Sequence, residues 1–183
     1  MSNNKKITEV KIAISGKSGC GNTTVSRLVA DTLGLRFINF TFRSLAEERG
    51  IALNDVLALA AKDDSVDREV DTRQVEMARE SGGCVLGSRL AIWMLPEADM
   101  KVVLAARPET RAMRIQRREG GELRDIAEFT AARDKQDRER YMKIYKIDND
   151  DYSFADLVID TDDIVPQQIV DIIIAQVTSK TTL

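Results

Sequence analysis

The length, composition and charge of the chain describe a globular protein and exclude several classes of function. The 183 residues are 43% hydrophobic and 31% charged, with a formal net charge of −3. No overall positive field therefore favours a nucleic-acid polymer as partner. No apolar run approaches the ~20 residues that a membrane-spanning helix needs, so we expect no membrane contact. The chain has no histidine, which removes most serine–histidine and zinc chemistries.

The cysteines and the lack of internal boundaries narrow the setting further. Cys20 and Cys84 make neither a disulfide framework nor a metal motif, and we expect a reduced, cytoplasmic protein. No repeat, low-complexity segment or linker divides the sequence. We therefore expect a single domain over residues 1–183.

Short apolar segments alternate with helical patterns along the chain. The predicted strands are 10–15, 35–39, 84–86, 100–105 and 157–160, and the predicted helices are 23–33, 42–49, 53–62, 65–80, 108–119, 122–145 and 166–177. Strands that alternate with helices form a parallel sheet with helices on both faces. The sequence thus predicts an α/β fold with a five-stranded parallel sheet, whose ligands bind at the carboxyl ends of the strands.

The stretch between the first predicted strand and helix has the layout of a phosphate-binding loop. It nearly fits G-x-x-x-x-G-K-[ST], with Gly16, Gly21 and Thr23 in place but Asn22 at the lysine position. Glycines allow backbone N–H groups to wrap a phosphate, and the next helix directs its positive end at the same point. The Thr23 hydroxyl is placed to bind Mg²⁺, and Lys17 is the candidate to replace the missing charge. The alternative is a glycine-rich turn without a ligand.

Arginines after the predicted strands give a second signal. Arg43 follows the second strand and Arg89 follows the third, and we expect both beside the phosphate loop. Arginine stays charged and binds two phosphate oxygens at once, which suits phosphoryl transfer. Further arginines lie on the fifth and sixth predicted helices: Arg111, Arg114, Arg117, Arg118, Arg133, Arg138 and Arg140. The alternative for these is a solvated surface with ion pairs between neighbouring turns.

The fourth predicted helix carries a third group of charged residues, namely Asp67, Arg68, Asp71 and Arg73. These residues either line the site of the molecule that accepts the phosphoryl group or form ion pairs on the helix surface, and the sequence favours neither interpretation.

Several longer segments point to one family. They are Ile14-Ser15-Gly16 with Ser18-Gly19-Cys20-Gly21, Phe42-Arg43-x-Leu45-Ala46-x-Glu48-Arg49-Gly50, Asp67-Arg68-Glu69-Val70-Asp71-x-Arg73-Gln74, Arg89-Leu90-Ala91-x-Trp93-Met94, Arg111-Ala112-x-Arg114-Ile115, and Glu139-Arg140-Tyr141 with Tyr145-x-Ile147-Asp148. With these segments the chain resembles, over nearly its whole length, the cytidylate (CMP) kinases of the short, archaeal-type branch. These belong to the adenylate-kinase-like nucleoside monophosphate kinases. The resemblance implies a three-layer P-loop kinase fold with a short helical lid.

The resemblance also implies a reaction, in which the γ-phosphoryl group of ATP is transferred to CMP or dCMP with Mg²⁺ bound to ATP. The implied ATP-binding residues are Gly16, Lys17, Ser18, Gly19, Cys20, Gly21, Asn22, Thr23, Thr24, Arg114 and Arg118, with Thr23 at the metal. The implied CMP-binding residues are Arg43, Arg89, Arg133, Asp137 and Arg140, and the implied catalytic residues are Lys17, Arg114, Arg118, Arg133 and Arg140. The acceptor-binding region would span about 39–82 and the lid about 114–140, in an enzyme expected to be monomeric.

Two departures from the family pattern keep other functions open. Asn22 replaces the loop lysine, and residues 39–41 lack the usual serine-glycine or glycine-aspartate pair of the acceptor region. The alternatives are a P-loop kinase for another small acceptor, and a nucleotide-binding regulatory module that has lost catalysis.

Overall fold

The sheet is arranged around the first strand of the chain. A computed structural model describes residues 5–181 and contains five parallel strands in the order β2-β3-β1-β4-β5. The strands are β1 (Lys11–Gly16), β2 (Arg36–Ile38), β3 (Cys84–Gly87), β4 (Met100–Ala105) and β5 (Leu157–Asp160). Because helices cover both faces of β1, Ile12, Ala13 and Ile14 are all fully buried, which explains the uninterrupted apolar run in the sequence.

Every predicted strand and helix is present, with small differences at the ends. The helices are α1 (Asn22–Leu33), α2 (Phe42–Arg49), α3 (Leu53–Ala60), α4 (Ser65–Arg79), α5 (Ala91–Met94), α6 (Pro108–Glu119), α7 (Leu123–Tyr145) and α8 (Pro166–Lys180). A short 3-10 helix, Ile7–Glu9, leads into β1 and is not predicted by the sequence pattern. α8 continues past its predicted end at 177, where buried Val177 still packs on the core.

Two apolar layers enclose the sheet. On one face, α1 and α8 contribute Val25, Val29 and Ile173 to a core that includes Ile12 and Ile14 of β1. On the other face, α4 and α5 pack against Ala13, Leu86 and Val103. A smaller cluster joins α2, α3 and α4 through residues such as Leu45, Val56 and Val70. The result is the three-layer arrangement expected for this α/β fold.

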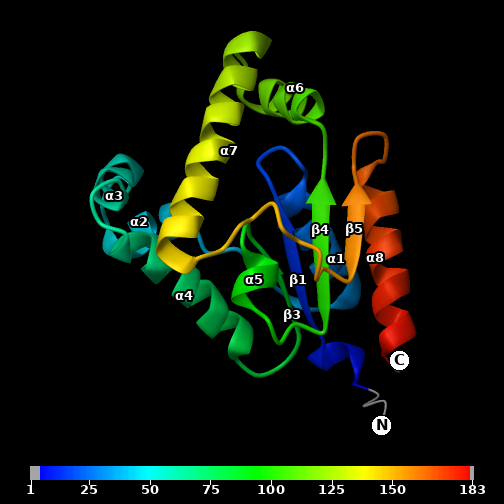
Figure 1. Cartoon of the computed structure of the whole chain (residues 1–183). Helices are drawn as coiled ribbons and strands as arrows, with labels where there is room; N and C mark the ends of the chain where they lie inside the picture. Colours follow the sequence, from blue (N-terminus) through cyan, green and yellow to red (C-terminus); the bar gives the residue numbers. More distant parts are fainter. Residues whose placement is uncertain (1–4, 182–183) are drawn as a thin grey trace.

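The helices α6 and α7 lie beyond the carboxyl ends of the strands (Figure 1). They pack on each other, and α7 crosses from α6 to the α2–α4 side of the molecule (Figure 1). The loop after β1 therefore lies beneath two long charged helices. None of the helices within residues 5–181 combines the length and the apolar character that crossing a membrane requires.

Candidate functional site

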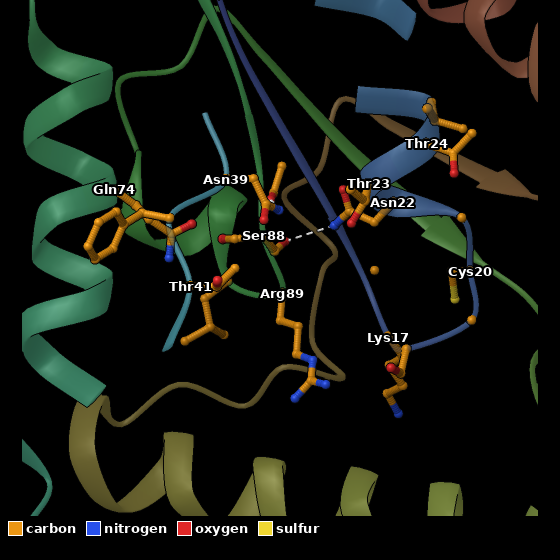
Figure 2. Close-up of a pocket in the computed structure, with 18 of the residues that line it drawn as sticks. Lys17, Cys20, Asn22, Thr23, Thr24, Asn39, Thr41, Gln74, Ser88 and Arg89 are labelled. Atoms are coloured by element: carbon orange, nitrogen blue, oxygen red, sulfur yellow. Dashed lines mark hydrogen bonds between the residues drawn. The ribbon is translucent and has the colours of Figure 1, made fainter. Parts of the chain in front are cut away.

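The carboxyl ends of the strands open into a cavity of about 600 Å³. Its wall combines the phosphate loop, residues 16–24, with arginines from three other places in the chain: Arg89, Arg114, Arg118, Arg133 and Arg140. Figure 2 shows Lys17 and Arg89 extending toward the same helix, α7. The structure thus brings the predicted donor and acceptor residues to one cavity, with the exception of Arg43 and Asp137.

The phosphate loop is shaped by its glycines and by the helix above it. Gly19 and Gly21 have φ angles of 88° and 89°, in the left-handed region that side chains disfavour. A Cβ atom at Gly19 would also lie only 2.8 Å from the backbone oxygen of Arg111. Glycine is therefore needed at position 19 both for the turn and for the close approach of α6.

Three consecutive carbonyl groups of the loop are bound from outside. The Ser18 oxygen accepts from Arg111 Nη1 at 3.1 Å and the Gly19 oxygen from Arg114 Nη1 at 3.4 Å. The Cys20 oxygen lies 3.4 Å from the Thr161 hydroxyl, whose proton it shares with the Ala105 carbonyl at 3.0 Å. Because the outward carbonyls have donors, the loop can keep its backbone N–H groups directed at an anion in the cavity.

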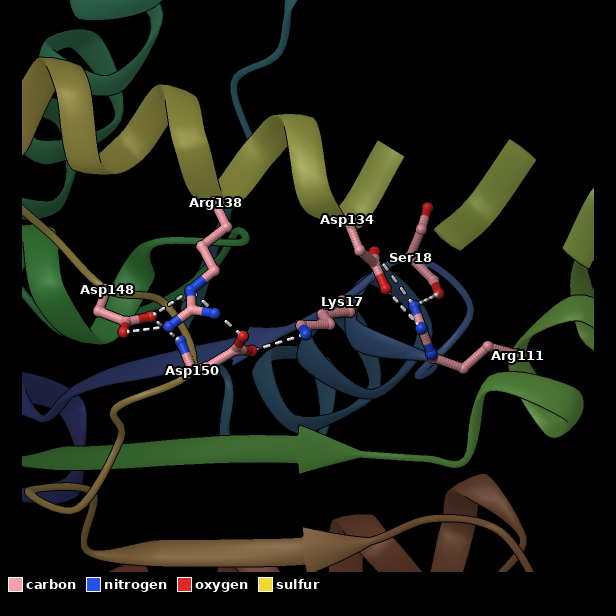
Figure 3. Close-up of polar contacts among 7 residues, drawn as sticks. All are labelled: Lys17, Ser18, Arg111, Asp134, Arg138, Asp148 and Asp150. Atoms are coloured by element: carbon pink, nitrogen blue, oxygen red, sulfur yellow. Dashed lines mark hydrogen bonds and ion pairs between the residues drawn. The ribbon is translucent and has the colours of Figure 1, made fainter. Parts of the chain in front are cut away.

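Arg111 also joins the loop to α7. Its guanidinium group pairs with Asp134, at 2.5 Å from Nη2 to Oδ2, and the two side chains are 5% and 17% exposed (Figure 3). Such a buried pair holds its partners firmly, because separating them leaves an uncompensated charge. Arg111 belongs to a family segment of the sequence but lies outside the predicted site, and only its position in the fold shows this contact.

At the lysine position of the motif, Asn22 makes three hydrogen bonds. Its Nδ2 donates to the carbonyl of Ser88 at 3.0 Å (Figure 2) and to that of Ile14 at 3.1 Å. Its Oδ1 accepts from the Ser26 hydroxyl at 2.9 Å. The asparagine therefore ties the start of α1 to β1 and to the segment after β3. Its side chain is used for structure and brings no positive charge to the loop.

The predicted acceptor residues on α7 belong to an ion-pair network at the cavity. Asp137 pairs with Arg89, and with Arg140 at 3.0 Å, while Arg140 also lies 3.5 Å from Asp67. Partial burial and the positive charge of Arg89 lower the pKa of Arg133. Asp137 thus orients two arginines, and Arg133 remains as a cation in a positive environment, which favours an anionic ligand.

The polar residues of α4 divide between the two interpretations that the sequence left open. Asp67 and Asp71 line the cavity, whereas Arg73 forms an exposed ion pair with Glu48 at 3.0 Å and Arg68 donates to the carbonyl of Ile144. Other polar and aromatic residues of the wall are not among the predicted site residues, namely Asn39, Phe40, Thr41, Phe42, Gln74, Ser88 and Tyr141. Gln74 continues the polar stripe of positions 67 and 71 on α4, and this spacing is the signal that points to Gln74 as a further residue of the wall.

Some predicted charges have a surface role or lie apart from the cavity. The exposed side chain of Arg138 on α7 pairs with Asp148 at 2.6 Å, which matches the alternative of solvated ion pairs. Arg43 is exposed on α2, and the part of the cavity wall that the structure describes does not include it. Its neighbours Thr41 and Phe42 do line the cavity, so Arg43 lies next to the wall without being part of it. Its role at the acceptor phosphate stays a prediction.

The five-stranded parallel sheet and its covering helices form the fold of P-loop kinases. Shikimate kinase from Acinetobacter baumannii, in complex with shikimate, superposes with a TM-score of 0.65 at 18% identity, covering 96% of this chain and 97% of that one. A gluconokinase from Sinorhizobium meliloti 1021 gives a TM-score of 0.60 at 15% identity, covering 96% and 94%. At these identities the likeness concerns the fold alone.

Sequence comparison then gives the family. Residues 11–163 match the model of the cytidylate kinase-like family, and the chain belongs to that family. Cytidylate kinase 2 of Borreliella afzelii is 46% identical over 168 residues, which cover 90% of this chain and 94% of that protein. The cytidylate kinase of Archaeoglobus fulgidus is 37% identical over 173 residues, covering 93% and 96%. The resemblance drawn from the sequence segments is confirmed, including its archaeal relatives.

Proposed function

We propose that this protein is an ATP-dependent cytidylate kinase, which transfers the γ-phosphoryl group of ATP to CMP or dCMP to give ADP and CDP or dCDP. One observation carries the proposal. A single cavity is lined by the phosphate loop and by arginines from the end of β3, from α6 and from α7. Two phosphate-bearing substrates need such an arrangement, because their negative charges must be brought together and neutralised before transfer.

The donor ATP would occupy the side of the cavity formed by the phosphate loop and α6. Backbone N–H groups of residues 16–24 and the N-terminus of α1 would hold its phosphates. Arg118 is exposed on α6 at the same cavity. Ile164, Pro166 and Ile169 give this wall an apolar part, which suits the flat face of an adenine base.

The acceptor CMP would lie between residues 39–82 and α7, with α6 and α7 over residues 114–140 acting as the lid. Arg89, Arg133 and Arg140 would bind its 5′-phosphate, with Asp137 holding two of them in place. One phosphate oxygen of CMP attacks the γ-phosphorus of ATP while the bond from that phosphorus to the β–γ bridging oxygen breaks. The nucleophile is already anionic, so the reaction needs positioning and charge neutralisation but no dedicated general base.

Mg²⁺ is expected to enter with ATP. Thr23 is exposed in the first turn of α1 and lines the cavity. Residues 5–181 contain no group of three or more cysteine, aspartate or glutamate side chains arranged to hold a metal. A single threonine hydroxyl fits an ion that takes most of its oxygen ligands from phosphate and water, as Mg²⁺ does in kinases. Thr23 would then be the protein ligand. The ion would neutralise charge on the transferred phosphoryl group.

We expect the protein to be a monomer in the cytoplasm, a reducing compartment in which cysteines stay unpaired. Both cysteines are free and buried, and burial raises the pKa of the Cys20 thiol within the phosphate loop. A protonated, buried thiol reacts slowly, so Cys20 fills space in the loop.

A coupled assay with ATP, Mg²⁺ and a panel of acceptors tests the proposal. Rapid formation of CDP from CMP is the expected result. Faster turnover of another acceptor would support the alternative of a different small-molecule kinase. ATP binding without turnover of any acceptor at any Mg²⁺ concentration would support the regulatory module.

A further inference from the structure

We propose that Gln74 reads the base of the acceptor nucleotide and that Asp71 fixes the Gln74 carboxamide so that cytosine is selected over uracil. The proposal rests on the cytidylate kinase activity proposed above and assigns the residues that recognise its substrate. It makes Gln74 a binding residue and Asp71 a positioning residue.

Gln74 presents an unused hydrogen-bond acceptor at the cavity. The residue is 5% exposed and lines the cavity wall, and its side chain points from α4 into the cavity (Figure 2). Its Oε1 atom is buried, and no donor within residues 5–181 reaches it. Buried polar atoms are almost always hydrogen-bonded, so an acceptor left open in a binding cavity indicates a donor on the ligand.

The carboxamide of Gln74 has a preferred orientation. Its Nε2 donates to Asp71 Oδ1 at 3.4 Å, and Asp71 Oδ2 accepts from the hydroxyl of Tyr145 on α7 at 2.6 Å. Rotating the amide by 180° would place its oxygen against the Asp71 carboxylate, and two acceptors repel each other. Tyr145 and Asp71 therefore fix Gln74 Nε2 on the side of Asp71, and Gln74 Oε1 stays available to the ligand.

This orientation distinguishes the two pyrimidine bases. Cytosine carries an amino group at position 4, which donates, whereas uracil carries a carbonyl oxygen there, which only accepts. An amino group satisfies Gln74 Oε1, while a carbonyl oxygen would leave both acceptors buried and unpaired. Sites built around such a bond reject the wrong group strongly. We expect discrimination of at least about 30-fold between CMP and UMP from this contact.

The test measures equilibrium binding and turnover of CMP and UMP, in the presence of Mg²⁺ and ATP or a non-hydrolysable ATP analogue. The variants are Gln74→Met, which keeps the length but removes the polar group, and Asp71→Asn, which removes the carboxylate that fixes the amide. Glu76→Met, on an exposed position of the same helix, is the matched control.

The ratio of kcat/KM for CMP to that for UMP should fall at least tenfold in Gln74→Met, mainly because kcat/KM for CMP decreases. In Asp71→Asn this ratio should fall mainly because kcat/KM for UMP increases, since the Gln74 amide can then rotate. Glu76→Met should keep the wild-type ratio. A ratio is insensitive to the amount of folded protein, so a merely structural effect would not move it.

The outcomes separate the two proposals. Wild-type CDP formation with an unchanged ratio in both variants would overturn the assignment of Gln74 and Asp71 and leave the proposed activity intact. Preferential CMP binding that both variants abolish, without any CDP formation, would support the assignment and overturn the proposed activity. Equal binding of CMP and UMP by the wild type would overturn the assignment directly.

Discussion

Lys17 of the phosphate loop and Asp150, in the segment after α7, form an ion pair with 2.6 Å between Nζ and Oδ1. Arg138 of α7 contacts the same segment through Asp148 at 2.6 Å and Asp150 at 3.6 Å (Figure 3). Lys17 is the cation expected to replace the lysine that Asn22 displaces. In this structure its ammonium group is held by a carboxylate, so a bound triphosphate has to compete with Asp150.

Substituting Lys17 and Asp150 separately tests whether the lysine serves ATP. Lys17→Met should lower kcat/KM for ATP at least about tenfold, because a hydrogen bond to a charged group is worth about 1.5–3 kcal/mol. Asp150→Asn should change it less than about threefold, since both side chains are more than a third exposed and exposed pairs contribute about 0–1 kcal/mol. Steady-state kinetics with ATP as the varied substrate gives both values. Equal losses in the two variants would mean that the ion pair matters and the phosphate contact does not.

The buried pair of Arg111 and Asp134 predicts a large effect on stability. Asp134→Ala should lower the free energy of unfolding by about 3–5 kcal/mol, because Arg111 is then left as an unpaired buried charge. The matched control is Glu128→Ala, which breaks an exposed pair on the same helix and should cost less than about 0.5 kcal/mol. Urea denaturation followed by circular dichroism measures both. Similar small losses would show that the buried pair does not hold α6 to α7.

Arg43 is the acceptor-side residue that the cavity wall does not include. If it reaches the CMP phosphate when the substrate binds, Arg43→Ala should raise the KM for CMP at least about tenfold, because a charge-assisted contact is lost. The KM for ATP should stay within about twofold. Arg49→Ala is the control, since Arg49 lies on the same helix and pairs with Glu69 at 2.5 Å. An Arg43 variant with wild-type CMP kinetics would remove this residue from the site.

Base selection should depend on pH through Asp71. Burial, together with the Asp67 carboxylate, raises the pKa of Asp71 to about 6, against the opposing effects of the Tyr145 hydroxyl and Arg140. Above pH 6 the ionised carboxylate accepts from Gln74, and below pH 6 the protonated acid no longer fixes the amide. The ratio of kcat/KM for CMP to that for UMP should therefore fall as the pH decreases from 7.5 to 5.5.

Both substrates carry the same titrating phosphate, so its ionisation cancels in this ratio. The Asp71→Asn variant should give a ratio that does not change with pH, which makes it the control. A wild-type ratio that stays constant from pH 5.5 to 7.5 would contradict the role of an ionised Asp71.

The sequence determined the order and type of the elements, and with them the α/β class. These properties depend on local patterns: β-branched apolar runs for β1 and β4, apolar stripes at helical spacing, and glycines such as Gly34 and Gly50 that end helices with φ angles of 64°. The phosphate loop was predictable for the same reason, because its residues are consecutive and its glycines have a backbone function.

Only the tertiary structure decided which partners the polar and charged side chains of the site contact. Asn22 contacts Ser88, Lys17 contacts Asp150, and Gln74 receives its orientation from Tyr145 through Asp71. Most of these partners are distant in the sequence and meet because the strand order and the crossing of α7 bring them together. A sequence shows which side chains carry charge or hydrogen-bonding groups. It does not show which of those groups are already occupied by a neighbour, and that occupancy decides which of them remain free for a ligand.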